Sequence, residues 1–123
     1  MYFKQRVGLA GENIACGYLQ INNYKIINRN FKCNQGEIDI IAFDIEKNEL
    51  VFFEVKTRTN SKYGLPVEAV GEVKQTHMVK AIKYYLYKNN IYKIPIRIDV
   101  IEVCINKTKY QLNHIKRIET KEQ

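Results

Sequence analysis

Two runs of β-forming residues, joined by a short polar segment, constrain the fold of this chain more than any other part of its sequence. Residues 37–43 and 50–57 are rich in Ile, Val and Phe, and residues 44–49 between them are mostly charged or polar. This pattern is typical of an antiparallel β-hairpin. Apolar side chains occupy both faces of the two runs, so we expect other elements of the chain to cover both faces of the hairpin.

Hydrophobic periodicity in the rest of the chain predicts two helices and three more strands. The resulting order, α-β-β-β-α-β-β, predicts an α/β fold in which helices pack on a mixed sheet of about five strands. The elements outside the hairpin are helices at residues 5–20 and 72–88, strands at 25–31, 96–105 and 110–115, and a mobile loop at 58–66.

Length and composition indicate one domain. The chain has 123 residues, of which 46% are hydrophobic and 27% are charged, and this suffices for one hydrophobic core but not for two. No segment is apolar enough to span a membrane, and residues 1–15 lack the apolar core of an export signal. The three cysteines include no C-x-x-C pair, which argues against a disulfide framework or a zinc site. We therefore expect a cytoplasmic protein, not bound to membranes, with a single domain over residues 1–123 and a flexible basic tail from about residue 116.

The charge of the chain favours a polyanionic partner. The formal net charge is +7 and the pI is about 9.3, which suits nucleic acid. The alternative is compositional drift, because a genome rich in A and T would supply many Lys, Ile and Asn codons without any selection for binding. Charge alone does not decide between the two.

Charged residues of the predicted hairpin gather on one face, at the end away from the turn. If Glu46 and Lys47 form a two-residue turn, Asp39 lies opposite Glu54, and Glu37 lies opposite Lys56. The rest of that face is apolar, and buried carboxylates are costly unless they are paired or bind a metal. Mg²⁺ or Mn²⁺ prefers oxygen ligands and would also relieve the repulsion between two carboxylates. The alternative is a cross-strand ion pair, of Glu54 or Asp39 with Lys56, that only ties the hairpin together.

The Glu-x-Lys spacing suits hydrolysis of a phosphodiester. Glu54 and Lys56 are two residues apart on one strand face, roughly 7 Å along the strand. Glu54 could then bind the metal while Lys56 reaches the attacking water or the phosphate. The metal would lower the pKa of the water, and the lysine would stabilise developing charge. The sequence therefore predicts a metal-dependent phosphodiesterase site.

A series of short motifs runs through the chain in a fixed order. They are Gly8-x-x-Gly11-Glu12-x-x-Ala15, Arg29-Asn30-Phe31, Gly36-Glu37-Ile38-Asp39-Ile40-Ile41, Phe53-Glu54-Val55-Lys56-Thr57-Arg58, Ala69-Val70 with Lys74, and Arg97-Ile98-Asp99-Val100. Asp39 with Glu54-Val55-Lys56 resembles the core of the PD-(D/E)xK nuclease superfamily. The whole series resembles the YraN family, small bacterial proteins similar in fold to archaeal Holliday-junction resolvases. Ile38 stands where the superfamily name has Pro, a departure that resolvase-like members share.

This resemblance implies a restriction-endonuclease-like fold and a set of site residues. It implies a metal held by Asp39 and Glu54 and completed by the Val55 carbonyl, with Lys56 as a catalytic residue. It also implies a further catalytic acid from the first helix, which falls on Glu12. The alternative for Glu12 is an acid in the first part of the helix that interacts favourably with the helix dipole.

Other residues near the predicted site are candidates for contacts with the substrate or with the catalytic residues. Arg58 and Lys62 follow the Glu-x-Lys strand and could bind a phosphate backbone, and the resemblance favours Lys74 and Gln75 as residues that face the site. Glu37 could be a metal ligand, a partner of Lys56 behind the catalytic residues, or a surface residue at a strand end, and the sequence does not choose among these.

The sequence assigns no function to four polar residues outside this site. Arg97 and Asp99 interrupt an apolar strand and are either a structural pair or part of a site. His77 and His114 have no ligand-like spacing.

We thus reach two hypotheses from different classes. The first is an Mg²⁺- or Mn²⁺-dependent endonuclease that acts on nucleic acid, with DNA, including branched DNA, favoured over RNA. The second is a non-catalytic adaptor that binds nucleic acid with the same fold. Asp39, Glu54 and Lys56 are all present, which favours the enzyme. The resemblance to resolvases also makes a homodimer an expectation.

Overall fold

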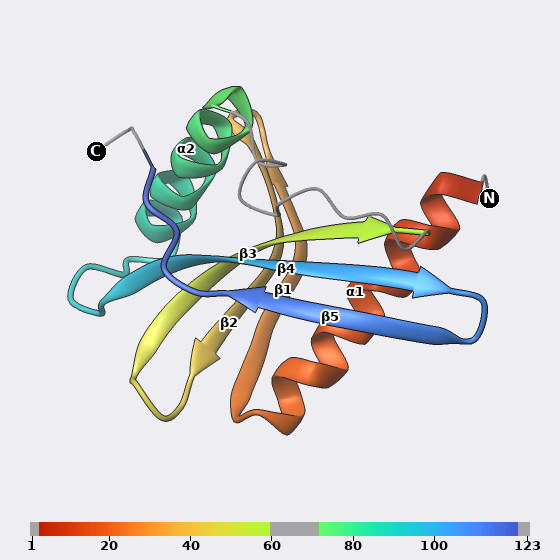
Figure 1. Cartoon of the computed structure of the whole chain (residues 1–123). Coiled ribbons are helices and arrows are strands. Elements are labelled where there is room, and N and C mark those ends of the chain that lie inside the picture. The colour runs from red at the N-terminus through yellow and green to blue at the C-terminus, as the bar shows by residue number, and fades with distance from the viewer. Residues whose placement is uncertain (1–2, 60–71, 121–123) are drawn as a thin grey trace.

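The computed structural model describes the backbone of residues 3–59 and 72–120, and the side chains of residues 5–59 and 76–120. The order α-β-β-β-α-β-β is confirmed (Figure 1). The elements are α1 (Phe3–Ile21), β1 (Tyr24–Cys33), β2 (Gly36–Asp44), β3 (Glu49–Arg58), α2 (Glu72–Lys88), β4 (Ile96–Asn106) and β5 (Lys109–Ile115).

The five strands form one mixed sheet in the order β1-β2-β3-β4-β5. β3 and β4 are parallel and are connected through α2, whereas the other neighbours are antiparallel. The predicted register of the β2–β3 hairpin is confirmed, because Ile40 pairs with Phe53 and Asp44 pairs with Glu49. Asn48, in the turn, has a φ of 56° and donates its N–H to the Asp44 carbonyl at 2.8 Å.

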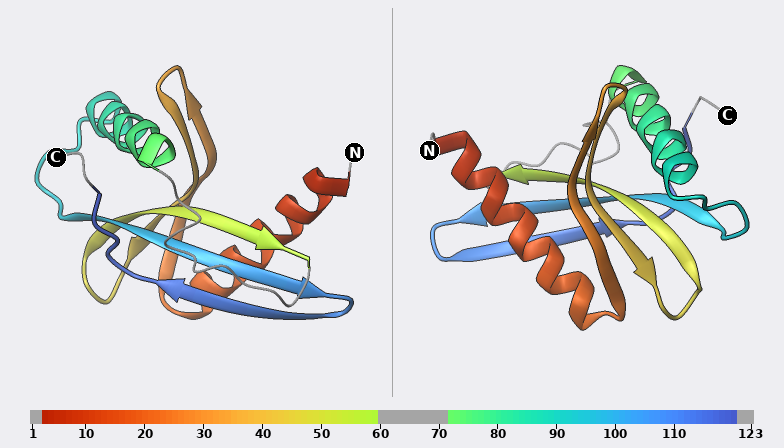
Figure 2. Two further views of the ribbon diagram at one scale, coloured as in Figure 1. Left: turned by 45° about the horizontal axis from the view of Figure 1, so that its top comes forward. Right: turned by 180° about the vertical axis from the view of Figure 1, so that it is seen from behind.

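The two helices cover opposite faces of the sheet, as the apolar residues on both faces of the hairpin require (Figure 2). On one face, Leu19 of α1 packs in a cluster that includes Phe53 and Ile101. On the other face, Ile82 of α2 packs in a cluster that includes Phe52. Alternate residues of β3 therefore face α1 and α2, and this fixes which side of the sheet each later residue of the strand points to.

The first half of β2 leaves β3 and bends with β1 toward α2 (Figure 1). The β2–β3 ladder extends only as far as Ile40 and Phe53, whereas the β1–β2 ladder continues to the pair Cys33 and Gly36. Ile38 joins the α2 cluster, although Ile40 packs on the α1 side. The strict alternation expected over residues 37–43 is therefore wrong at its start, because the strand turns at Asp39.

The segment after β5 is held against the sheet at two points. The backbone N–H of Arg117 donates to Asp99 at 2.9 Å, and that of Ile118 donates to the Ile98 carbonyl at 2.9 Å. These contacts fix the beginning of the basic tail expected from about residue 116, and flexibility of the rest stays a prediction. Within the part of the chain that the structure describes, neither helix is long and apolar enough to cross a membrane.

Helix α1 lies close to the end of β3 because of a glycine. A Cβ added at Gly11 would lie 1.9 Å from Oγ1 and 2.7 Å from Cγ2 of Thr57, whereas one added at Gly8 would meet nothing within 4 Å. The close approach at Gly11 brings the first half of α1 next to the strand that carries Glu54 and Lys56.

These two glycines give a matched pair of variants. Gly11→Ala should lower the free energy of unfolding by about 1–3 kcal/mol, the usual cost of overpacking, because Thr57 must move. Gly8→Ala should instead be neutral or stabilising by up to about 1 kcal/mol, since alanine favours a helix interior. Urea denaturation measures both, and equal effects at the two positions would contradict the close packing of α1 on β3.

Candidate active site

Asp39 lies at the point where β2 parts from β3. Its Oδ2 accepts a hydrogen bond of 2.8 Å from the backbone N–H of Val55. A side chain of β2 thus contacts β3 where the backbone ladder has ended. The N–H and C=O of one strand residue point to the same side of the strand, so the Val55 carbonyl also faces the side of Asp39.

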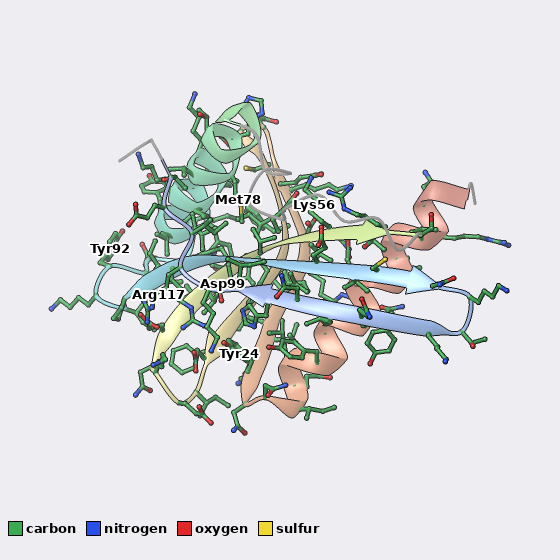
Figure 3. All side chains as sticks on the ribbon, in the orientation of Figure 1. Tyr24, Lys56, Met78, Tyr92, Asp99 and Arg117 are labelled. Carbon is green, nitrogen blue, oxygen red and sulfur yellow. The ribbon has the colours of Figure 1, made fainter. Side chains whose placement is uncertain are left out.

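Glu54 and Lys56 project from β3 toward the α2 side of the sheet, in line with Phe52. The Glu54 side chain is 3% exposed and that of Lys56 is 27% exposed, and Lys56 Nζ lies 3.7 Å from Glu54 Oε1. Figure 3 shows Lys56 on the same side of the sheet as Met78 of α2. A buried carboxylate is therefore paired with a lysine whose side chain is partly exposed. Lys56 is thus ion-paired with Glu54, but the pair runs along β3 and is not the cross-strand pair of the alternative interpretation.

Glu12 approaches from the α1 side. Its side chain is 16% exposed, and its buried Oε1 lies 3.7 Å from Nη2 of Arg29 but makes no hydrogen bond with the described residues. Glu12 and Val55 line the same cavity of about 450 Å³, together with Arg58. Glu12 is thus close to the stretch of β3 that Asp39 contacts, and its catalytic role stays a prediction.

The donor set suits a hard divalent cation. Asp39 and Glu54 offer carboxylate oxygens, Val55 offers a carbonyl, and Glu12, whose Oε1 accepts no hydrogen bond from the described residues, lines the same cavity as Val55. Among the described side chains of residues 5–59 and 76–120, no three His, Cys, Asp or Glu are grouped closely enough to bind a metal by themselves. A cation here would therefore need the Val55 carbonyl and water as additional ligands.

The structure describes only some of the remaining predicted site residues. Glu37 is exposed and pairs with Lys32 of β1, so its expected position opposite Lys56 is wrong, because β2 has left β3 before that point. Lys62 lies outside the described residues. The backbone of Lys74 and Gln75 is in the first turns of α2, but their side chains are outside the described part. Their contacts with substrate stay predictions.

One buried acid beside this site is not among the residues predicted from the sequence. Glu102 of β4 is the register partner of Lys56, and its Oε2 accepts a hydrogen bond of 3.0 Å from Nε of Arg58. A signal was present, since Glu102 interrupts an apolar strand in the same way as Asp99, but a strand pattern does not say which neighbouring strand supplies the partner.

A second group of charges lies at the opposite end of the hairpin, near its turn, and centres on Arg97 (Figure 3 labels Tyr24, Asp99 and Arg117 of this group). The Arg97 side chain is 3% exposed, and its guanidinium donates to Asp44 at 2.8 Å, to Glu49 at 2.7 Å, to Asp99 at 3.1 Å and to the Tyr24 hydroxyl at 2.7 Å. Burial raises the pKa of Tyr24 to about 12. The Arg97–Asp99 pair is thus confirmed, and it belongs to a buried structural network.

His114 and Arg117 complete this network. His114 Nε2 lies 2.8 Å from Asp99 Oδ2, and its Nδ1 lies 2.8 Å from the Tyr18 hydroxyl. Arg117 donates to Glu49 at 2.6 Å and 2.9 Å. Burial by itself raises the pKa of Asp99, but hydrogen bonds from His114 and from Arg97 outweigh it and hold that pKa below its ordinary value. Hydrogen bonds from Arg117 likewise lower the pKa of Glu49.

Fold and site together define a class of protein: a small basic α/β domain whose mixed sheet carries two carboxylates and a lysine where two of its strands part.

Residues 11–103 match the family described as Uncharacterised protein family UPF0102. The chain is 46% identical over 115 residues to a UPF0102 protein of Caldanaerobacter subterraneus subsp. tengcongensis, covering 94% of this chain and 93% of that protein. It is 44% identical over 116 residues to a UPF0102 protein of Clostridium botulinum strain Alaska E43, and 40% identical over 117 residues to one of Clostridium perfringens strain 13, with 93% of each chain covered in both cases. The chain belongs to UPF0102, the family that its motifs resemble under the name YraN.

Proposed function

We propose that this protein is a metal-dependent endonuclease that hydrolyses phosphodiester bonds in nucleic acid, with DNA as the favoured substrate. One observation carries the proposal. Asp39 accepts a hydrogen bond from the backbone N–H of Val55, the residue that follows the buried Glu54, and the partly exposed Lys56 lies 3.7 Å from Glu54. The net charge of +7 adds an attraction for polyanions.

In this proposal each residue has a separate task. Asp39, Glu54 and the Val55 carbonyl would bind the cation, which supplies a water of lowered pKa and neutralises charge on the phosphate. The Val55 N–H fixes one oxygen of Asp39 at 2.8 Å, so that this carboxylate is held in place before a ligand binds. Lys56 is partly exposed and held near Glu54, and its ammonium would orient the attacking water or stabilise the charge that develops on the phosphate.

The test is a cleavage panel of single-stranded, duplex, flap and four-way-junction DNA, with the matching single-stranded and duplex RNA, in Mg²⁺ or Mn²⁺ and in EDTA. We expect metal-dependent cleavage of at least one DNA substrate. Binding without cleavage of any substrate would favour the adaptor hypothesis instead. The absence of both binding and cleavage would refute the endonuclease and the adaptor hypotheses together.

Metal binding has a readout that does not depend on activity. A ligand that binds only the folded state stabilises it by about 2.7 kcal/mol at one hundred times its Kd, which for a chain of this size raises Tm by about 10 °C. Mn²⁺ should therefore raise the Tm of the wild type but not that of Asp39→Asn, which keeps an oxygen for the Val55 N–H. The control is Glu46→Gln, at the exposed turn between β2 and β3, which should respond like the wild type. An equal Mn²⁺ shift in Asp39→Asn would place the cation elsewhere.

A further inference from the structure

Glu102 is a buried acid to which the mechanism above gives no role. It lies on β4 beside Lys56, its side chain is 2% exposed, and its partner is Arg58 at the end of β3. Ile101 and Val103 of the same strand pack on the α1 side, so Glu102 points to the other side of the sheet, where Lys56 lies.

Stability alone does not account for a charged residue at this position. Val100, Ile101 and Val103 around it are completely buried. Removing two charges from water costs free energy that the attraction between them rarely recovers in full, and apolar replacement of a buried pair is often neutral or stabilising. An apolar residue would suit this strand at least as well, and the acid therefore calls for a role other than packing.

The pair is asymmetric in exposure. Arg58 has a side chain that is 35% exposed, against 2% for Glu102. Arginine has five N–H donors, and within the described part of the chain the Arg58 guanidinium makes its hydrogen bond through Nε. The terminal nitrogens form a planar fork that matches two oxygens of a phosphate. Lys56 is held next to it in the same manner, as a partly exposed cation beside a buried carboxylate.

We propose that Arg58 and Glu102 form a phosphate-binding unit for the nucleic-acid backbone next to the scissile phosphate. Arg58 donates its terminal nitrogens to the two non-bridging oxygens of one phosphodiester. Glu102 is a positioning residue that fixes the guanidinium through Nε and touches no substrate itself. The inference rests on the proposed function, since it takes nucleic acid as the substrate.

The test measures affinity and cleavage separately. Binding of a fluorescein-labelled DNA duplex, flap and four-way junction is measured in EDTA by anisotropy over a range of salt concentrations. Arg58→Met should weaken binding about tenfold or more and reduce the slope of log K against log salt by about 0.9. Glu102→Met, which removes the acceptor but keeps the volume, should weaken binding by a similar factor, and the double variant should bind no more weakly than Arg58→Met. Cleavage at saturating substrate should change little while KM rises.

General electrostatics makes the opposite prediction, because removal of a negative charge should tighten binding to a polyanion. Glu102→Gln keeps an acceptor for Nε and should retain most of the affinity, whereas Glu46→Gln, at the far end of the hairpin, should bind like the wild type. Arg58→Lys keeps the charge but loses the fork and should bind as weakly as Arg58→Met, which tests the unit even if Glu102→Met fails to fold.

Three results would overturn the inference. The first is tighter binding by Glu102→Met, and the second is full affinity in Arg58→Lys. The third is loss of the Mn²⁺-dependent Tm shift in Glu102→Gln, which would make Glu102 a metal ligand. The inference and the nuclease proposal fail separately. A wild type that binds DNA but never cleaves it refutes the nuclease and still allows the binding test, whereas unaltered binding in the Arg58 and Glu102 variants of an active enzyme refutes only the inference.

Discussion

Replacing Lys56 by alanine is expected to reduce metal-dependent cleavage by about 10² or more, the scale for losing one preorganised electrostatic group, while affinity for nucleic acid changes only a few-fold. The ammonium lies 3.7 Å from a buried carboxylate and 27% of the side chain is exposed, so it is held in place and still accessible to a phosphate. The rest of the basic surface is untouched and continues to supply most of the binding. Single-turnover cleavage together with anisotropy in EDTA separates the two effects.

Three further variants sharpen this test. Glu54→Gln should abolish metal-dependent cleavage while binding persists or tightens, because a negative charge leaves the site. Lys56→Arg keeps the charge but changes its shape, so recovery would indicate general electrostatics, and continued loss would indicate a positioned ammonium. Lys80→Ala removes an exposed lysine of α2 and should cleave like the wild type. Wild-type rates in both the Glu54 and Lys56 variants would mean that a contaminant cleaves the DNA and that the site assigned here is wrong.

The part of the fold nearest the site could be predicted because two local signals agree there. Apolar residues on both faces of the hairpin required cover on both sides. A turn centred on residues 46 and 47 set the register, which the pairs Ile40–Phe53 and Asp44–Glu49 confirm, although the turn spans residues 45–48 and not two residues. Side-chain alternation on β3 then put Glu54 and Lys56 on one face, as the structure has them.

The bend of β2 could not be predicted from the same signals. Ile38 and Ile40 are both apolar and two residues apart, so their pattern is that of one continuous strand, yet they pack on opposite helices. What separates them is the contact of Ile38 with the distant helix α2, and local periodicity contains no information about it. The misplaced position of Glu37 follows from the same bend.

The burial of several charged side chains could not be predicted for a related reason. Asp44 and Glu49 belong to a polar connection and have the sequence character of solvent-exposed turn residues, yet both are buried against Arg97, which follows them by about fifty positions along the chain. Glu102 was missed in the same way, since its partner Arg58 is on another strand. Partners from distant segments determine whether such a charge is buried, and a single sequence does not show them.

Arg97 holds three buried carboxylates, and its loss should be the most damaging single substitution for stability. Asp44, Glu49 and Asp99 are 4%, 9% and 0% exposed, and each accepts a hydrogen bond from the Arg97 guanidinium. Breaking a buried ion pair from one side typically costs about 3–5 kcal/mol, because the other charge is left uncompensated. In a domain with about 5–15 kcal/mol of total stability, Arg97→Met should therefore lower Tm by about 10–20 °C or prevent folding.

The pH dependence identifies the cause of that loss. In the wild type the pKa values of Asp44, Glu49 and Asp99 lie below their ordinary values, so their contribution to stability is full above about pH 4, the unfolded value, and is lost as the pH falls through the folded pKa values. Without Arg97 the buried carboxylates take up protons more readily, and the gap in stability between Arg97→Met and wild type should narrow between pH 7 and pH 4.5.

Arg117→Met removes the other arginine on Glu49, but that side chain is 54% exposed, and the cost should be about 1 kcal/mol or less. Urea denaturation at pH 7 and pH 4.5 measures the free energy of unfolding of the wild type, Arg97→Met and Arg117→Met. If Arg97→Met is only marginally folded, Tm values replace the urea midpoints. Arg97 Cζ also lies over the Tyr24 ring, 5.8 Å from its centroid, and a gap that stays constant with pH would mean that Arg97 stabilises the sheet through this packing and not through its charge.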